Sequence, residues 1–211
     1  MASYIDEKLK KKTSKTMKSK EMFLEELRKR MPSDEAEKIW RDARKRLYKA
    51  YAEHVDIPKG VRSHTDSFIF PAGAIYLAMK EKDETMAFEV MEKKMAEKSK
   101  KMGASLAKMC KHKWFRKFFL GMWDTMSHKM FGNTCGFQNV FYPKEEGCFR
   151  MDVTACPYNK YLTEMGCPEI NILFCKNDEY TYGNLPGLKF SRTKTIGAGN
   201  DLCDFKMELK K

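Results

Sequence analysis

The side chains best suited to chemistry gather in the last third of this chain, from Asp152 to Phe205. Four of the seven cysteines lie there, among turn-forming residues, acids and one arginine. The cysteines are Cys156, Cys167, Cys175 and Cys203. Thiols beside acids and an arginine suit either covalent catalysis or metal binding.

Cys175 is the first candidate for a nucleophile. We expect it at the C-terminal end of a short helix that begins at Pro168-Glu169, with Asp178 three residues further on. A carboxylate in that place does not lower the pKa of a thiol by its charge, but it can accept a proton or orient a water molecule. The alternative is that Cys175, which follows three apolar residues, is a packed and unreactive side chain.

Cys203 is the second catalytic candidate, in a strand where its side chain faces the same way as Asp201 and Phe205. The preceding strand of the expected hairpin carries Arg192, whose guanidinium suits a substrate carboxylate. Alternatively, the acids cap turns and the arginine forms a surface ion pair. The predicted substrate-binding residues are Arg192, Thr193, Thr195 and Asp204.

Metal binding remains open as the other use of these thiols. Cys156, Cys175 and Cys203 would then converge on zinc with a carboxylate, although the long separations give no recognisable zinc motif. No two cysteines are spaced as C-x-x-C and their number is odd, which favours reduced thiols and a cytoplasmic location. None of the four histidines forms an H-x-x-x-H pair, and no phosphate-binding loop or Ser-His-Asp pattern is visible.

The elements that must position these residues differ between the two parts of the chain. Apolar residues recur at helical spacing through the first 130 residues. The expected helices cover 8–30, 36–54, 71–79, the segment after Asp83, and 111–130. The wide aromatic and methionine stripe of the last helix is interpreted as core packing.

The pattern changes after Phe131-Gly132-Asn133, where β-prone segments begin. Strands are predicted at 137–142, 148–153, 188–196 and 202–209, with short helices at 157–165 and 168–175. The predicted fold is α+β, with an N-terminal helical layer packed on a small, mostly antiparallel four-stranded sheet. Residues 1–32 are predicted to be a basic helical extension. Residues 33–211 are predicted to form one domain, helical over 33–130 and containing the sheet and site over 131–211.

The net charge of +12 lies entirely in the first part of the chain. Residues 131–211 hold 10 Lys+Arg and 10 Asp+Glu. Of the 41 Lys+Arg and 29 Asp+Glu in the whole chain, residues 1–130 therefore hold 31 and 19. The lysines alternate with glutamates along helical repeats, so no nucleic-acid partner is expected. No apolar run approaches the length that spans a bilayer, so no membrane partner is expected either. The N-terminal helices are a possible surface for a homo-oligomer.

The order of the C-terminal motifs resembles the L-2-amino-thiazoline-4-carboxylic acid hydrolase family over about residues 64–208. An earlier match is Phe70-Pro71-x-x-Ala74-Ile75-Tyr76-x-Ala78-Met79. The later motifs are Asp152-x-Thr154-x-Cys156, Gly166-Cys167-Pro168-Glu169, Cys175-x-x-Asp178, Pro186-Gly187-Leu188-x-Phe190-x-Arg192-Thr193-x-Thr195-Ile196 and Gly199-x-x-x-Cys203-Asp204-Phe205. The chain has Lys206 where such proteins often have arginine, which is a mild departure.

The resemblance implies an enzyme that opens a C–N bond in a cyclic, amidine-like small molecule. The corresponding mechanism has Cys175 attacking the electrophilic ring carbon, Asp178 moving a proton and Arg192 holding a carboxylate. The chain is also more distantly similar to the 4-vinyl-reductase type of small-molecule-binding domain. That similarity implies the alternative function, a sensor-like domain with a cysteine-rich zinc site and no hydrolytic activity.

Overall fold

The computed structural model describes residues 2–210, and the side chains of residues 6–210. The chain divides into two compact units. Unit 1 contains the chain up to Lys94 together with Tyr161–Ile170, and unit 2 contains Met95–Lys160 and the chain from Asn171. Helices α6 and α8 each contribute residues to both units, so the chain passes between the units through continuous helices.

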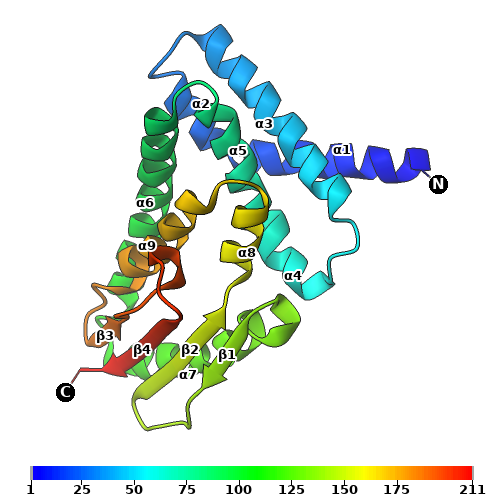
Figure 1. Ribbon diagram of the computed structural model, residues 1–211. Helices are drawn as coiled ribbons and strands as arrows, with labels where there is room; N and C mark the ends of the chain where they lie inside the picture. Colours follow the sequence, from blue (N-terminus) through cyan, green and yellow to red (C-terminus); the bar gives the residue numbers. More distant parts are fainter. Residues whose placement is uncertain (1, 211) are drawn as a thin grey trace. The chain divides into compact units, whose positions relative to one another are not determined.

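Unit 1 is helical. Its elements are α1 (Ala2–Ser19), α2 (Glu21–Leu27), α3 (Ser33–Glu53), α4 (Lys59–His64), the π-helical turn η1 (Thr65–Ile69), α5 (Phe70–Lys80), the start of α6 (Glu84–Met109), the end of α8 (Pro157–Glu164) and the 3₁₀ turn η3 (Pro168–Ile170). Helix α3 packs along α5, and Figure 1 shows α1 running across α3. Met17 of α1 and Leu27 of α2 are fully buried. The N-terminal residues therefore contribute to the core of unit 1, while their separation as an extension ending at residue 32 stays a prediction.

Unit 2 holds the sheet and the predicted site. Its elements are the rest of α6, α7 (Lys113–Met130), the 3₁₀ turn η2 (Asn133–Cys135), β1 (Gln138–Phe141), β2 (Cys148–Ala155), the start of α8, α9 (Asn171–Tyr182), β3 (Leu188–Ser191), the 3₁₀ turn η4 (Ile196–Ala198) and β4 (Cys203–Leu209). The strand order is β1-β2-β4-β3, and every neighbouring pair is antiparallel. This confirms the predicted α+β class and the four-stranded sheet.

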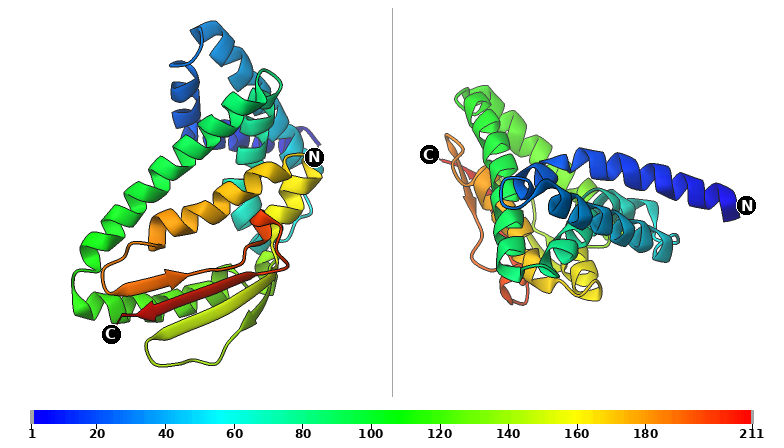
Figure 2. Two further views of the ribbon diagram at one scale, coloured as in Figure 1. Left: turned by 60° about the vertical axis from the view of Figure 1, so that its left-hand side comes forward. Right: turned by 90° about the horizontal axis from the view of Figure 1, so that it is seen from above.

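Helix α7 covers one face of the sheet in unit 2 (Figure 2). Buried side chains at alternate positions of β2 face it, namely Phe149, Met151 and Val153. Phe119 and Leu120 of α7 belong to the same core. The stripe of α7 is therefore core packing at Phe119, with Phe115 and Trp123 partly buried against the same core. The interpretation of the whole stripe as core was wrong, because Trp114, Phe118, Met122 and Met126 are exposed.

Three predicted boundaries were wrong in ways that affect the site. The helix expected at 168–175 is a 3₁₀ turn followed by α9, which continues to Tyr182. Cys175 consequently lies in the first half of α9 and not at a helix C-terminus. The strand expected at 188–196 ends at Ser191, and residues 196–198 form a 3₁₀ turn. Near this turn the Asn200 side chain accepts a hydrogen bond from the Thr195 backbone N–H, and such side chain–backbone bonds favour turns over a continuing ladder.

Candidate active site around three cysteines

Three cysteines that are far apart in the sequence lie near one another in unit 2. Cys156 precedes α8, Cys175 lies on α9 and Cys203 begins β4. Each thiol is close enough for its charge to affect another: Cys175 and Cys203 both act to raise the pKa of Cys156. Cys203 is buried, whereas Cys156 and Cys175 are partly exposed. The fold therefore brings the three predicted thiols together.

The turn η4 holds two of these thiols. The Ile196 backbone N–H donates a hydrogen bond to Cys203 Sγ at 3.2 Å, and Thr195 Oγ1 lies 3.4 Å from the same sulfur. The Thr195 hydroxyl also acts to lower the pKa of the Cys175 thiol. One hydroxyl thus connects the thiols of α9 and β4.

Local sequence explains why the turn lies so close to α9. A side chain at Gly197 would place its Cβ 2.7 Å from Cys175 Sγ and 3.1 Å from the Ile172 Cα. Gly199 has a φ of 88°, which a residue with a side chain rarely adopts. Asn200 closes the turn by accepting from the Thr195 backbone N–H at 3.0 Å. The Gly197-Ala198-Gly199-Asn200 segment lies between the strands predicted at 188–196 and 202–209, and its glycines were the available signal for this close approach.

Cys156 lies at the N-terminal end of α8. The backbone N–H groups of Tyr158 and Asn159 bond to its sulfur. Donors at a helix start stabilise a thiolate, yet burial outweighs them and raises the pKa of Cys156 to about 12. Burial also raises the pKa of Cys175, but Thr195 and the charge of Arg192 oppose that effect. Cys175 therefore has the stronger support as a nucleophile of these two.

Arg192 is buried and fully engaged with α9. Its side chain is 2% exposed, and Nη1 donates to Asp178 at 3.0 Å. Nη2 donates to the Cys175 carbonyl oxygen at 2.8 Å and to Glu179 at 2.9 Å. Partial burial raises the pKa of Asp178, whose side chain is 34% exposed, to about 6, against the lowering effect of Arg192. The structure shows Arg192 bracing the helix that carries Cys175, and its binding of a substrate carboxylate stays a prediction.

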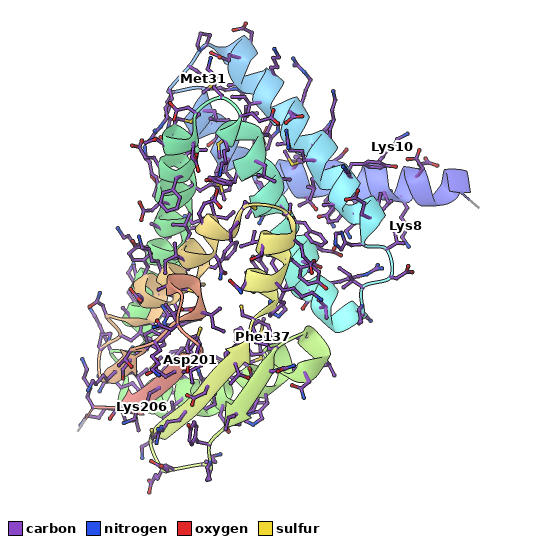
Figure 3. All side chains as sticks on the ribbon, viewed as in Figure 1. Lys8, Lys10, Met31, Phe137, Asp201 and Lys206 are labelled. Carbon is purple, nitrogen blue, oxygen red and sulfur yellow. The ribbon has the colours of Figure 1, made fainter. Side chains whose placement is uncertain are left out.

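Asp204 is occupied in a similar way. Its carboxylate accepts from the Thr193 backbone N–H at 2.8 Å, the Thr193 hydroxyl at 2.6 Å and the Lys194 backbone N–H at 2.5 Å. Burial acts to raise the pKa of Asp204, but these bonds hold it below its ordinary value. Asp201 is exposed in the bend before β4 (Figure 3). Asp204 and Thr193 thus fix the segment between β3 and η4, and their predicted contact with substrate stays a prediction.

Aromatic side chains that the sequence reasoning did not select line the same part of unit 2. The rings of Tyr158 and Phe174 have centroids 4.8 Å apart, and those of Trp123 and Tyr182 are 4.2 Å apart. Burial raises the pKa of both tyrosines well above the ordinary value. They were missed because their positions resemble ordinary core aromatics. Of these rings, that of Tyr158 lies close enough to Cys156 for the charge of the thiolate to act on its hydroxyl.

The donor set does not fit zinc in the part of the chain that the structure describes. Among residues 2–210, no three or more His, Cys, Asp or Glu side chains are placed to hold a metal ion. The sulfur of Cys203 bonds to Thr195 and Ile196, as described above. No observation therefore favours Cys156, Cys175 and Cys203 as a zinc site, and no step is assigned to a metal.

An open groove of about 460 Å³ lies elsewhere in unit 2, between α7 and the β1–β2 turn. None of the predicted site residues lines it. Its rim combines Lys117, Lys144 and Arg150 with Asp124 and Glu145, so its charge selects no ligand class. The predicted site at the three thiols therefore lies outside this groove.

The remaining motifs form a structural clamp within unit 1. Glu169 Oε1 accepts from the Tyr76 hydroxyl at 2.7 Å and from Lys80 Nζ at 2.5 Å. A Cβ at Gly73 would lie 3.3 Å from the sulfur of Cys167, which is fully buried. Burial raises the pKa of Cys167 to about 12. The fourth cysteine of the C-terminal third is therefore a packing residue.

Comparison with known families gives one match, over residues 62–207, to the model named L-2-amino-thiazoline-4-carboxylic acid hydrolase. The chain belongs to this family. The match includes both the clamp of unit 1 and the three-cysteine site of unit 2, in agreement with the resemblance found in the motifs. Membership of the L-2-amino-thiazoline-4-carboxylic acid hydrolase family indicates a hydrolase and a small-molecule substrate. No curated protein and no solved structure gave a match.

The structure also bears on membrane association. Within residues 2–210, no helix is both long and apolar enough to cross a membrane.

Proposed function

We propose that this protein is a thiol-dependent hydrolase that opens a C–N bond of a cyclic, amidine-type small molecule, as in L-2-amino-thiazoline-4-carboxylate hydrolysis. The observation that carries the proposal is the connection of Cys175 and Cys203 through the Thr195 hydroxyl, beside the Arg192–Asp178 pair. Family membership supports the reaction class.

Cys175 is the nucleophile in this proposal. Its thiolate adds to the amidine carbon, forming a C–S bond, and the ring nitrogen takes up the proton that the thiol has lost. The adduct then collapses with cleavage of the C–N bond, so that the ring nitrogen leaves as an amine. Water attacks the sulfur-bound carbon, the C–S bond breaks and the thiol is restored. One water molecule is consumed and no oxidant is required.

Asp178 moves the proton between thiol and ring nitrogen. It lies three residues after Cys175 on α9, which places the two on neighbouring positions of one helix face. A carboxyl group whose pKa is about 6 exchanges protons readily near neutral pH. Cys203 keeps the Thr195 hydroxyl in place, because its sulfur lies 3.4 Å from that hydroxyl and accepts a hydrogen bond from the Ile196 backbone N–H.

Arg192 is proposed to hold the substrate carboxylate by exchanging one partner. Glu179 is the exchangeable partner because its side chain is 59% exposed, whereas that of Arg192 is 2% exposed. A substrate carboxylate that replaces Glu179 at Nη2 gains a charge-assisted hydrogen bond without exposing the guanidinium. Asp178 and the Cys175 carbonyl oxygen keep the arginine in place during this exchange.

The direct test is turnover of L-2-amino-thiazoline-4-carboxylate by the full chain, with Cys175→Ala compared with Cys167→Ala. Product is followed by liquid chromatography and mass spectrometry, and intact-protein mass spectra after rapid quenching detect the covalent adduct. We expect the Cys175→Ala variant to lose both turnover and adduct. The Cys167→Ala control, which removes a buried thiol, should keep both in the fraction of the protein that is folded.

Full turnover by the Cys175→Ala variant would show that the nucleophile is wrong. If no cyclic amidine is hydrolysed by the wild type, the proposed reaction is wrong. Metal analysis of the purified protein addresses the alternative. Stoichiometric zinc lost on substitution of Cys156 and Cys203 would establish the sensor-like metal site instead.

A further inference from the structure

The outer side of α7 carries apolar side chains that the core does not cover. Trp114 is 69% exposed and Phe118 is 58% exposed, and Met122 and Met126 follow at 40% and 42%. A spacing of four residues places each of them on the next turn along one side of the helix. The neighbouring positions Phe119 and Leu120 are buried against the sheet. Helix α7 therefore has an apolar surface wider than its contact with the core.

The end of α6 also carries exposed apolar side chains. Met102 is 50% exposed and Met109 is 42% exposed, and α7 follows α6 after a short turn at residues 110–112. Arg116 braces that turn by donating from Nε to the Cys110 carbonyl oxygen at 2.6 Å. We call this region, residues 98–126, the α6–α7 corner. Figure 2 shows the two helices meeting at one end of unit 2.

The corner is also strongly basic. Between residues 98 and 126 there are seven lysines and one arginine, and Asp124 is the single acid. All seven lysines are exposed: Lys98, Lys100, Lys101, Lys108, Lys111, Lys113 and Lys117. None of these lysines forms an ion pair among the residues that the structure describes, while Lys100 lies over the Tyr180 ring. This excess differs from α3, where six basic residues stand among five acids.

We propose that the α6–α7 corner docks on the surface of an anionic lipid bilayer. Exposed Trp, Phe and Met side chains on one helix flank enter the interfacial region, while lysine ammonium groups reach lipid phosphates. Each such lysine strengthens binding to an anionic surface, so several of them together favour docking. Docking needs no membrane-spanning segment, so it is compatible with the absence of such a helix from residues 2–210.

Two other occupants fit the corner less well. A second copy of the chain would bring two surfaces of the same positive charge together, which opposes association. A nucleic acid would match the charge, but base stacking uses aromatic rings, and four of the six exposed apolar side chains are methionines. Charge and apolar composition together favour lipid.

The test is co-sedimentation of the full chain with vesicles of phosphatidylcholine alone and with 30 mol% phosphatidylserine. We expect binding to the anionic vesicles only, and a marked loss of binding in high salt because the lysine contribution is screened. The Lys111→Glu, Lys113→Glu, Lys117→Glu variant should bind at least tenfold more weakly. Trp114→Ser with Phe118→Ser should also lose binding, which separates insertion from simple charge attraction.

The matched control variant also replaces three basic residues with glutamate, but on another surface. Lys38→Glu, Arg41→Glu and Lys45→Glu alter exposed residues of α3 and should leave vesicle binding within twofold of the wild type. Circular dichroism and urea midpoints show whether each variant is folded. Equal loss of binding in both charge variants would overturn the proposal.

Two further outcomes would also overturn it. One is tighter binding to a single-stranded oligonucleotide than to vesicles. The other is a dimer, measured by light scattering, that is lost on Trp114→Ser while wild-type protein ignores vesicles. Because none of these measurements uses the thiol site, the docking proposal can fail independently of the proposed hydrolase function.

Discussion

The hydroxyl oxygen of Thr195 lies 3.4 Å from the sulfur of Cys203. The same hydroxyl acts to lower the pKa of Cys175, which belongs to a different element and lies 28 residues before Cys203 in the sequence. Thr195 therefore connects the two proposed catalytic thiols, and we expect its hydroxyl to influence the reactivity of Cys175.

Thr195→Val removes the hydroxyl and keeps the shape of the side chain. A lost hydrogen bond of about 1 kcal/mol corresponds to roughly a fivefold effect on the thiolate population. We expect Cys175 to be alkylated by iodoacetamide about three- to tenfold more slowly at pH 7.5, measured by peptide mass spectrometry. Thr195→Ser retains a hydroxyl and should react near the wild-type rate. Equal rates for the valine variant and the wild type would contradict the role of Thr195.

The pH dependence of activity should report Asp178. Because its pKa is raised to about 6 and its ionised form accepts the thiol proton, kcat/KM should fall as the pH falls below about 6. Asp178→Asn should lower kcat by about 10²- to 10⁴-fold and remove this limb of the profile. A limb that persists in the asparagine variant would assign it to another group.

The same shift predicts how stability depends on pH. Folding raises the pKa of Asp178 from its ordinary value of 3.8, so between about pH 4 and 6 the folded chain binds more protons than the unfolded chain. The contribution of this group to stability is therefore greatest below pH 4 and declines as the pH rises through 6. Urea unfolding across this range should show a smaller decline for Asp178→Asn than for the wild type.

Glu179→Gln tests the exchange of partners at Arg192. Replacing an exposed carboxylate with a neutral amide removes the competitor for the guanidinium while leaving the Asp178 pair intact. The KM for a carboxylate substrate should fall about two- to fivefold, with kcat little changed, since an exposed charge pair is worth about 0.2–1 kcal/mol. A substrate amide that lacks the carboxylate should show no change in KM. An unchanged KM for the carboxylate substrate would mean that it does not replace Glu179.

Gly197→Ala should damage the site sterically. The new Cβ would lie 2.7 Å from Cys175 Sγ and 3.1 Å from a backbone atom of α9, so the turn must move. We expect a loss of about 1–3 kcal/mol in the free energy of unfolding, together with reduced alkylation of Cys175. Gly121→Ala is the matched control because no atom lies within 4 Å of its Cβ. Wild-type stability and reactivity in Gly197→Ala would contradict this close approach.

Much of the fold was predictable because its signals are local. The helical spacing of Ala36, Leu47 and Ala50 identified α3, and turn residues separated the strand segments. The antiparallel pairing of β3 with β4 was predicted correctly, although β3 is shorter than the predicted strand. The length of α9 was mispredicted because no strong stop signal follows Cys175, and its continuation to Tyr182 depends on packing against β3 and η4.

The sequence by itself determined the α+β class, the family and the set of reactive residue types, since each depends on residue identity and spacing along the chain. The tertiary structure decided which of those residues meet. It joined Cys175 to Cys203 through Thr195, buried Cys167 and engaged Arg192 with α9. Such choices depend on contacts between segments far apart in the chain, where burial and hydrogen-bond partners set the chemistry of a side chain.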